Sequence, residues 1–183
     1  SAASDVYKRQ RGDPPSDADG SGQCYVTGLA GGDNDIDGGE TILTSPPLDA
    51  TEGDAHVAYW RWFHNSFGGN PFEDIFTVEI SDDGSNWVVL ETVGPGGDDV
   101  SGGWIYKTFR VADFVDANAS VQVRFRASDF GGGSVVEAGV DGIRMNRSAS
   151  GVSCDDGDDC PDPNGDGTID VSDVILMLAQ WGA

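Results

Sequence analysis

The chain has 183 residues, of which 32 are acidic and 10 are basic, and its formal net charge is −22. Such a chain offers no basic surface to neutralise phosphates, which argues against nucleic acid or an anionic membrane as a partner. Five Trp and eight Phe with 38% hydrophobic residues suffice for one packed core, and no apolar run reaches the ~18 residues of a membrane span.

The first 22 residues carry no pattern of regular structure. Residues 1–10, SAASDVYKRQ, resemble the translation of an adapter used to prepare sequencing libraries, and we interpret them as an assembly scar. We therefore expect the natural protein to extend further upstream, where a signal peptide or a catalytic domain could lie. Residues 11–22 consist mainly of Asp, Gly, Pro and Ser, and this composition predicts a linker.

Short apolar runs separated by Gly, Asn and Asp fill residues 23–147. Over 120–127, Val121, Val123 and Phe125 alternate with polar residues, which predicts a half-buried strand. Further strands are predicted at 24–27, 41–44, 57–64, 76–80, 87–93, 104–110 and 135–140, with 143–145 finishing the run. Short strands at this spacing without amphipathic helices indicate an antiparallel β-sandwich, for which a jelly roll is the expected version.

The segment HVAYWRWFHN over 56–65 concentrates large side chains. Alternation places Tyr59 and Arg61 on one face of the strand and Trp60 and Trp62 on the other. The pair that faces outward would offer aromatic rings for stacking against a sugar, and these four residues are our candidate ligand-binding residues. Sandwich core with partial cover by a loop is the alternative interpretation.

Residues 148–161 are small and acidic and form a predicted linker that contains Cys154 and Cys160. These two cysteines are close enough to close a small loop, and we predict a disulfide between them, as expected for an exported unit with little core. Cys24 is then either a buried thiol or a residue whose partner lies upstream.

The segment DPNGDGTIDVSD over 162–173 matches the EF-hand calcium loop. Gly167 stands at the sharp-turn position and Ile169 at the apolar plug, and Asp replaces the usual Glu at position twelve. Calcium prefers oxygen ligands, which short side chains on a tightly turning loop aim inward together. The predicted Ca²⁺ ligands are Asp162, Asn164, Asp166, Thr168, Asp170 and Asp173.

An apolar helix is predicted directly after this loop, and no helix is predicted before it. A calcium loop with an exiting helix resembles a type I dockerin repeat, a family that docks exported enzymes onto cohesin domains and mostly uses two such repeats. The resemblance covers 162–182 and implies a cohesin-like or cell-surface attachment partner. The residues that would contact such a partner are Val171, Ser172, Leu176 and Met177.

The segment from Asp33 to Arg144 opens with DNDIDGGETILTSP, contains the SDDGSNW hairpin and closes with VVEAGVDGIRM. With these motifs it resembles MAM-like and concanavalin-like jelly rolls appended to bacterial exported enzymes. The resemblance implies a structural calcium between the first strand region and the last, with Asp35, Asp37 and Asp141 as its ligands. Turn-forming Asp residues beside Gly are the alternative.

Catalytic patterns are weak in this sequence. The spacing of His56 and His64 does not fit a zinc-protease pair, and no Gly-x-Ser-x-Gly motif occurs. Glu73, Asp74 and Glu79 lack the Glu-x-Asp-x-Glu pattern of jelly-roll glycosidases. We expect a secreted, non-catalytic sandwich that binds polysaccharide or a surface ligand, with the calcium-dependent docking unit after it. A small jelly-roll hydrolase and a purely structural spacer are the alternatives.

Overall fold

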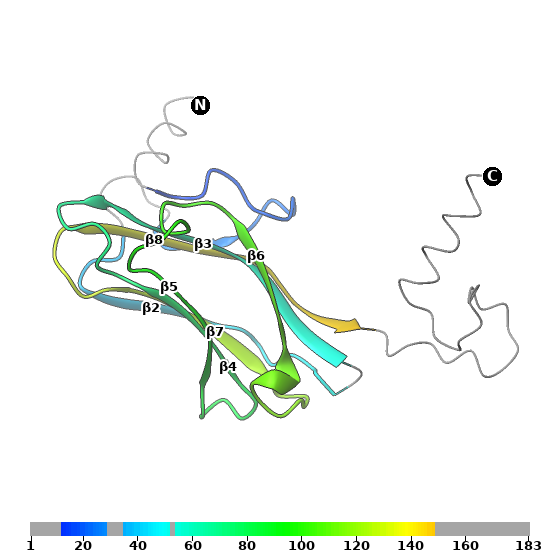
Figure 1. Cartoon of the computed structure of the whole chain (residues 1–183). Helices are drawn as coiled ribbons and strands as arrows, with labels where there is room; N and C mark the ends of the chain where they lie inside the picture. The colour runs from blue at the N-terminus through cyan, green and yellow to red at the C-terminus, as the bar shows by residue number, and fades with distance from the viewer. Residues whose placement is uncertain (1–11, 29–34, 52–53, 149–183) are drawn as a thin grey trace, which may run out of the picture. The chain divides into compact units, whose positions relative to one another are not determined.

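The computed structural model describes residues 12–28, 35–51 and 54–148, which form eight strands in two sheets (Figure 1). The chain divides after Arg147 into two units. The predicted calcium loop, its helix, Cys154 and Cys160 lie outside the described residues. Within those residues, none of the helical structure has the length and apolar character needed to cross a membrane.

The first sheet has the strand order β1-β8-β3-β6. The short edge strand β1 (Tyr25–Val26) pairs antiparallel with β8 (Ser134–Ser148), and Tyr25 lies opposite Val140. The long central strand β3 (Asp54–Gly68) pairs antiparallel with β6 (Ile105–Arg110), and Trp60 lies opposite Tyr106. A 3₁₀ turn, η1 (Val111–Asp113), follows β6.

The second sheet has the strand order β2-β7-β4-β5. Its strands are β2 (Gly39–Thr44), β7 (Gln122–Asp129), β4 (Phe76–Ser81) and β5 (Val88–Val93). All three pairings are antiparallel, and a bulge between Val78 and Glu79 shifts the register of β4 against β5. Both sheets pack face to face, and the expected antiparallel β-sandwich is confirmed (Figure 1).

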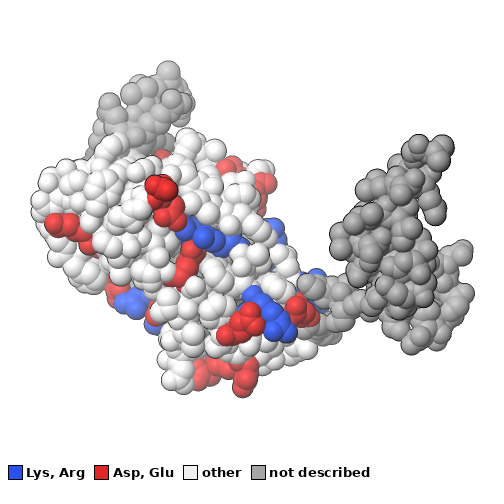
Figure 2. Space-filling model, viewed as in Figure 1, with Lys and Arg blue, Asp and Glu red and all other residues white. Residues whose placement is uncertain are grey.

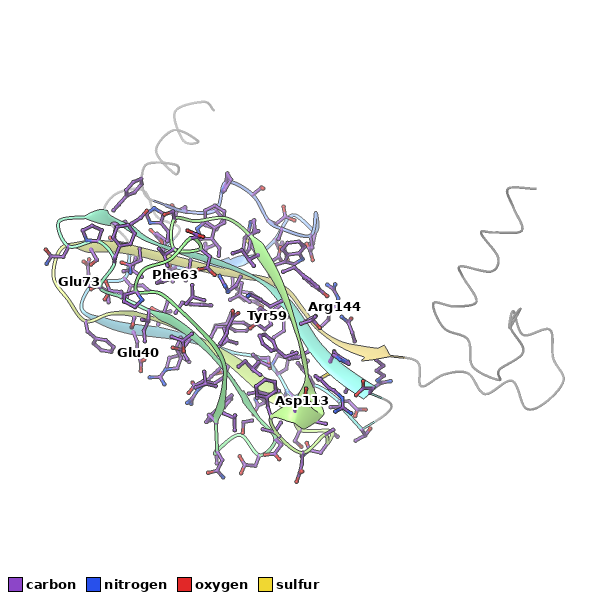
Figure 3. All side chains as sticks on the ribbon, in the orientation of Figure 1. Glu40, Tyr59, Phe63, Glu73, Asp113 and Arg144 are labelled. Carbon is purple, nitrogen blue, oxygen red and sulfur yellow. The ribbon has the colours of Figure 1, made fainter. Side chains whose placement is uncertain are left out.

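Alternating side chains of both sheets form the core between them. Val123, Phe125 and Ala127 of β7 are at most 3% exposed, as the alternation over 120–127 predicts. From the other sheet, Val57, Tyr59 and Phe63 are fully buried, and the Tyr59 ring meets the Phe125 ring edge-on at 5.0 Å. Figure 3 shows Tyr59 and Phe63 between the two layers.

The expected linker at 11–22 is different in the structure, where residues 12–22 pack against the sandwich. Trp62 Nε1 donates a hydrogen bond to the Gly12 carbonyl at 2.7 Å, and Trp104 Nε1 donates one to the Ser16 carbonyl at 2.8 Å. A Cβ on Gly139 would lie 3.2 Å from the Pro14 ring. This segment, here called the N-terminal cover, therefore lies on the outer face of the first sheet.

Basic side chains on the strands pair with acidic side chains. Figure 2 shows Lys and Arg side chains lying beside Asp and Glu on the visible face. On the second sheet Arg124 Nε lies 2.6 Å from Glu79 Oε2, and Arg126 Nη2 lies 2.6 Å from Glu40 Oε2. On the first sheet Arg110 lies 3.1 Å from Asp113.

Candidate functional site

Strand β3 separates the four candidate ligand-binding residues into two groups. Tyr59 and Arg61 point into the core and are 0% and 1% exposed, so neither side chain reaches the surface. Trp60 and Trp62 point to the outer face of the first sheet and are half-buried. The sequence left open which pair faces outward, and the outward pair is Trp60 and Trp62.

Arg61 has a structural environment inside the sandwich. Its Nε donates a hydrogen bond to Glu91 Oε1 at 3.0 Å, and its Nη2 donates one to Asp99 Oδ2 at 2.6 Å. The Tyr59 hydroxyl donates to the same Glu91 oxygen at 2.8 Å. Burial and the Glu91 charge raise the pKa of Tyr59, so the phenol stays a hydrogen-bond donor. These contacts join β3 of one sheet to β5 of the other.

Trp60 and Tyr106 lie side by side on the outer face of the first sheet. They are cross-strand partners, and their ring centroids are 5.1 Å apart at an interplanar angle of 54°. Arg144, labelled in Figure 3, approaches from β8 and places its guanidinium carbon 5.5 Å from the Tyr106 centroid. Tyr106 is 37% exposed, and Arg144 and Asn146 donate hydrogen bonds to its hydroxyl at 3.3 and 3.4 Å.

We call this group the Trp60 face and define it as Trp60, Tyr106, Arg144 and Asn146. It combines two aromatic rings with guanidinium and amide donors, a combination that suits a ligand with an apolar face and polar edges. Trp62 is in a different situation, because its ring packs against Trp104 at 5.8 Å and the N-terminal cover lies over both. The Trp60 face is therefore accessible, whereas Trp62 and Trp104 are covered.

A change of side-chain alternation in β8 positions Arg144 on this face. Val140 belongs to the core, and Ile143 and Met145 also pack against the core. The inward-facing residues of β8 therefore change from even-numbered to odd-numbered positions. The switch occurs at Gly142, whose φ of 54° is in the left-handed region that favours glycine. A Cβ on Gly142 would lie 3.3 Å from Trp60 and 3.6 Å from Arg144, so the backbone passes close beneath both.

Asp141 meets two acids of the N-terminal cover beside the Trp60 face. One carboxylate oxygen each of Asp17, Asp19 and Asp141 lies within 4.8 Å of the others, a spacing that could accommodate a cation. Asp141 Oδ2 also accepts hydrogen bonds from the backbone amides of Ala18 and Asp19, at 2.7 and 3.2 Å. The structure thus groups Asp141 with Asp17 and Asp19, and this group of three includes neither Asp35 nor Asp37.

Asp35 and Asp37 lie where their charges act on Asp129, at the end of β7. Burial, with the nearby charges of Asp74, Asp35 and Asp37, raises the pKa of Asp129 to about 6. Asp129 and Asp74 are 2% and 4% exposed. No sequence motif points to a binding role for either residue, yet one signal is present, because Asp129 continues the inward alternation of Val123, Phe125 and Ala127.

The acids considered for glycosidase chemistry have other surroundings. Glu79 accepts a hydrogen bond from Arg124 Nε at 2.6 Å, and Arg124 and Arg126 together hold its pKa below the usual range. Asp74 points inward, and its Oδ1 accepts a hydrogen bond from the Phe130 amide at 3.2 Å. Glu73 lies near Gly131, where a Cβ would be 3.2 Å from Glu73 Oε2.

Comparisons with known proteins give structural neighbours only. Neither a protein-family model nor a curated protein matches the chain. A cleaved adhesin domain of Lys-gingipain from Porphyromonas gingivalis is 17% identical, with 73% of this chain and 82% of that chain covered and a TM-score of 0.45. A carbohydrate-binding module specific for non-crystalline cellulose is 10% identical, with 60% and 66% covered and a TM-score of 0.39. A family 16 carbohydrate-binding module is 13% identical, with 71% and 80% covered and a TM-score of 0.35.

Proposed function

We propose that the sandwich is a non-catalytic module of jelly-roll type that binds polysaccharide chains on the Trp60 face. The observation that carries this proposal is the pairing of Trp60 with Tyr106 at 5.1 Å beside the Arg144 guanidinium. A pyranose ring has an apolar C–H face and hydroxyl groups around its edge. Aromatic rings can cover that apolar face while Arg144 and Asn146 donate hydrogen bonds to the hydroxyl groups.

Calcium at Asp17, Asp19 and Asp141 would support this face. Three carboxylates suit a hard cation that takes oxygen ligands. Two of them belong to the N-terminal cover and one to β8, so a cation there would fasten the cover beside Trp60. Asp19 Oδ2 would lie 3.5 Å from a Cβ on Gly142, the residue that follows Asp141.

For residues 162–183 we propose a dockerin-like unit that binds Ca²⁺ through the loop 162–173 and a cohesin-like or cell-surface partner through Val171, Ser172, Leu176 and Met177. The support is the sequence pattern described above. An exported protein that combines polysaccharide binding with attachment would keep an enzyme or a cell at its substrate. Secretion and a Cys154–Cys160 disulfide belong to the same proposal.

The test is affinity electrophoresis of the full chain with calcium, in gels that contain soluble xylan, hydroxyethyl cellulose or pullulan. We expect at least one polysaccharide to retard the wild type, and Trp60→Ala or Tyr106→Ala to weaken binding at least tenfold. Trp87→Ala is the matched control, because Trp87 is also half-buried but packs on Arg124 of the second sheet. Failure of every polysaccharide to bind, or equal binding by Trp60→Ala, would contradict the proposal and favour a structural spacer.

A further inference from the structure

Two buried carboxylates face each other at one end of the second sheet. Asp129 is the last residue of β7, and Asp74 precedes β4 by two residues. The register pairs Phe76 with Ala127, and the Ser128 amide donates a hydrogen bond to the Ile75 carbonyl at 3.1 Å. Continued by one residue, this register places Asp74 opposite Asp129. Side chains at opposite positions of antiparallel strands lie about 5 Å apart at their Cβ atoms.

Both side chains point between the sheets. Asp129 has the same alternation as Phe125 and Ala127, and Asp74 has the same alternation as Phe76 and Val78. Asp129 is 2% exposed and Asp74 is 4% exposed. Both positions lie at the end of the core, where the alternation predicts apolar residues, yet both are occupied by carboxylates.

One oxygen of each carboxylate is buried without a hydrogen-bond donor in the described part of the chain. These atoms are Asp129 Oδ1 and Asp74 Oδ2. A buried carboxylate oxygen that has lost water and gained no partner is costly, and two like charges on opposite strands repel each other. The nearest arginine along β7, Arg126, binds Glu40 and Glu79 instead.

Two further acids approach from β2. Asp35 and Asp37 precede this strand, whose first residue, Gly39, lies directly opposite Asp129. Their charges are among those that act on Asp129. Three chain segments therefore bring acidic residues to the same end of the second sheet. We call these four residues, Asp35, Asp37, Asp74 and Asp129, the Asp129 cluster.

Two glycines connect Asp37 to β2. Gly38 and Gly39 both have positive φ angles, and a Cβ built on either would meet no atom of the described residues within 4 Å. On the other side, the loops before β4 and after β7 are tied together. Asn70 Nδ2 donates a hydrogen bond to the Gly132 carbonyl at 2.7 Å, and Ser134 Oγ donates one to the Asn70 carbonyl at 2.8 Å. The loops next to Asp74 and Asp129 are thus held together, whereas the two glycines that follow Asp37 are not crowded.

We propose that the Asp129 cluster is a calcium site in which Asp74 and Asp129 are the inner ligands and Asp35 and Asp37 close the site from the β2 side. Calcium takes six to eight oxygen ligands in a flexible geometry, which four carboxylates and water can supply. The ion would compensate the like charges and give both unpartnered oxygens a ligand. It would also tie the segment before β2 to the ends of β4 and β7.

The test counts calcium ions on the full chain. The chelator-treated protein is dialysed against micromolar to millimolar CaCl₂, and bound calcium per chain is measured together with the melting temperature. We expect Asp129→Asn and Asp74→Asn each to bind one calcium fewer than the wild type and to show a smaller calcium-induced rise in melting temperature. The calcium-free variants should melt at the wild-type temperature or above, because one repelling charge has been removed.

Matched controls separate this site from the other calcium sites proposed above. In proteins that already carry Asp166→Ala or Asp19→Asn, adding Asp129→Asn should still remove one bound calcium per chain. If Asp129→Asn does not fold, Asp37→Asn on the segment before β2 tests the proposal instead. This variant should bind calcium at the Asp129 cluster at least tenfold more weakly than the wild type. Unchanged calcium number and melting shift in the variants that fold would overturn the proposal and leave a shared proton as the occupant of the pair. Calcium counting needs no polysaccharide, so failure of the Trp60 face would not affect this result.

Discussion

Arg61 shows how much a single residue of this sandwich depends on distant partners. It occupies a core-facing position of β3 and is 1% exposed, with Glu91 and Asp99 as its ion-pair partners. Lys107 adds a further positive charge 3.4 Å from Glu91. A buried ion pair contributes little net stability against an apolar replacement, but removal of one partner leaves a charge uncompensated.

Arg61→Ala is therefore expected to destabilise the protein by about 3 to 5 kcal/mol. The variant leaves Glu91 facing the core and removes two hydrogen bonds. Urea unfolding followed by tryptophan fluorescence gives the free energy of unfolding. Arg110→Ala is the control, because Arg110 is half-exposed and its pairs with Asp54 and Asp113 should contribute at most about 1 kcal/mol. Equal losses in the two variants would contradict the structural role of Arg61.

The sequence predicted the two faces of β3 but could not choose between them. Alternation separates Tyr59 and Arg61 from Trp60 and Trp62, and both pairs are large and amphipathic. Tyr59 and Arg61 face inward because both donate hydrogen bonds to Glu91. Glu91 lies 30 residues beyond Arg61 in the chain and on the other sheet. No local pattern contains that information. Likewise, Asp17 and Asp19 join Asp141 only through folding, since more than 120 residues separate them.

At the scale of the element, the outer face of the second sheet is held by an ion-pair ladder. Glu40 of β2, Arg124 and Arg126 of β7 and Glu79 of β4 alternate across three neighbouring strands. Opposite charges on neighbouring strands stabilise a sheet, and Glu79 is 7% exposed. The bulge beside Glu79 lies at the edge of this ladder.

The ladder predicts an acid-sensitive contribution to stability. Because the pKa of Glu79 is lower in the folded protein than in the unfolded chain, its contribution is complete above the unfolded pKa of about 4.5 and is lost as the pH falls through the folded value. Glu79→Gln should therefore lose less stability than the wild type between pH 5 and pH 3, although it is less stable at pH 7. Urea unfolding at each pH measures both effects. Asp98→Asn controls for net charge and should follow the wild type.

The sequence predicted all eight strands of the described residues, but it underestimated the length of the two longest, β3 and β8. The expected strand at 57–64 extends in the structure to Asp54–Gly68, and those at 135–140 and 143–145 form one strand, Ser134–Ser148. In β8 the reason is Gly142, which interrupts alternation while the strand itself continues. In β3 the extra residues, 54–56 and 65–68, lack the apolar alternation of 57–64. Backbone pairing extends the strand beyond that pattern, since the Asn65 amide donates a hydrogen bond to the Val100 carbonyl at 2.8 Å.

At the scale of the whole molecule, the N-terminal cover changes where the folded unit begins. Its composition of Gly, Asp, Pro and Ser predicts a linker, because it contains no apolar periodicity. The cover is nevertheless held by two tryptophan N–H groups and by the close approach of Pro14 to Gly139. These are contacts of its backbone and of one proline ring, which hydrophobic patterning does not detect.

Deletion of residues 1–22 should destabilise the sandwich by about 2 kcal/mol or more, because the Trp62 and Trp104 rings become exposed. We expect a lower melting temperature, a red shift of tryptophan emission and binding of a hydrophobic dye. Deletion of residues 1–10 alone is the control and should leave all three unchanged. If the longer deletion melts like the full chain, the cover contributes nothing to the stability of the fold.

The pairing of the first described segments with β8 also has a consequence for folding during synthesis. Residues 12–22 and β1 make their contacts with partners such as Gly139, Val140 and Asp141, and the Ala18 amide binds a carboxylate 123 residues away. Residues 12–22 and β1 leave the ribosome before β8 and must therefore wait for this last strand of the sandwich. Contacts of such long separation slow folding. During that delay residues 12–22 and β1 lack their partners on β8 and stay open to chaperones and to other chains.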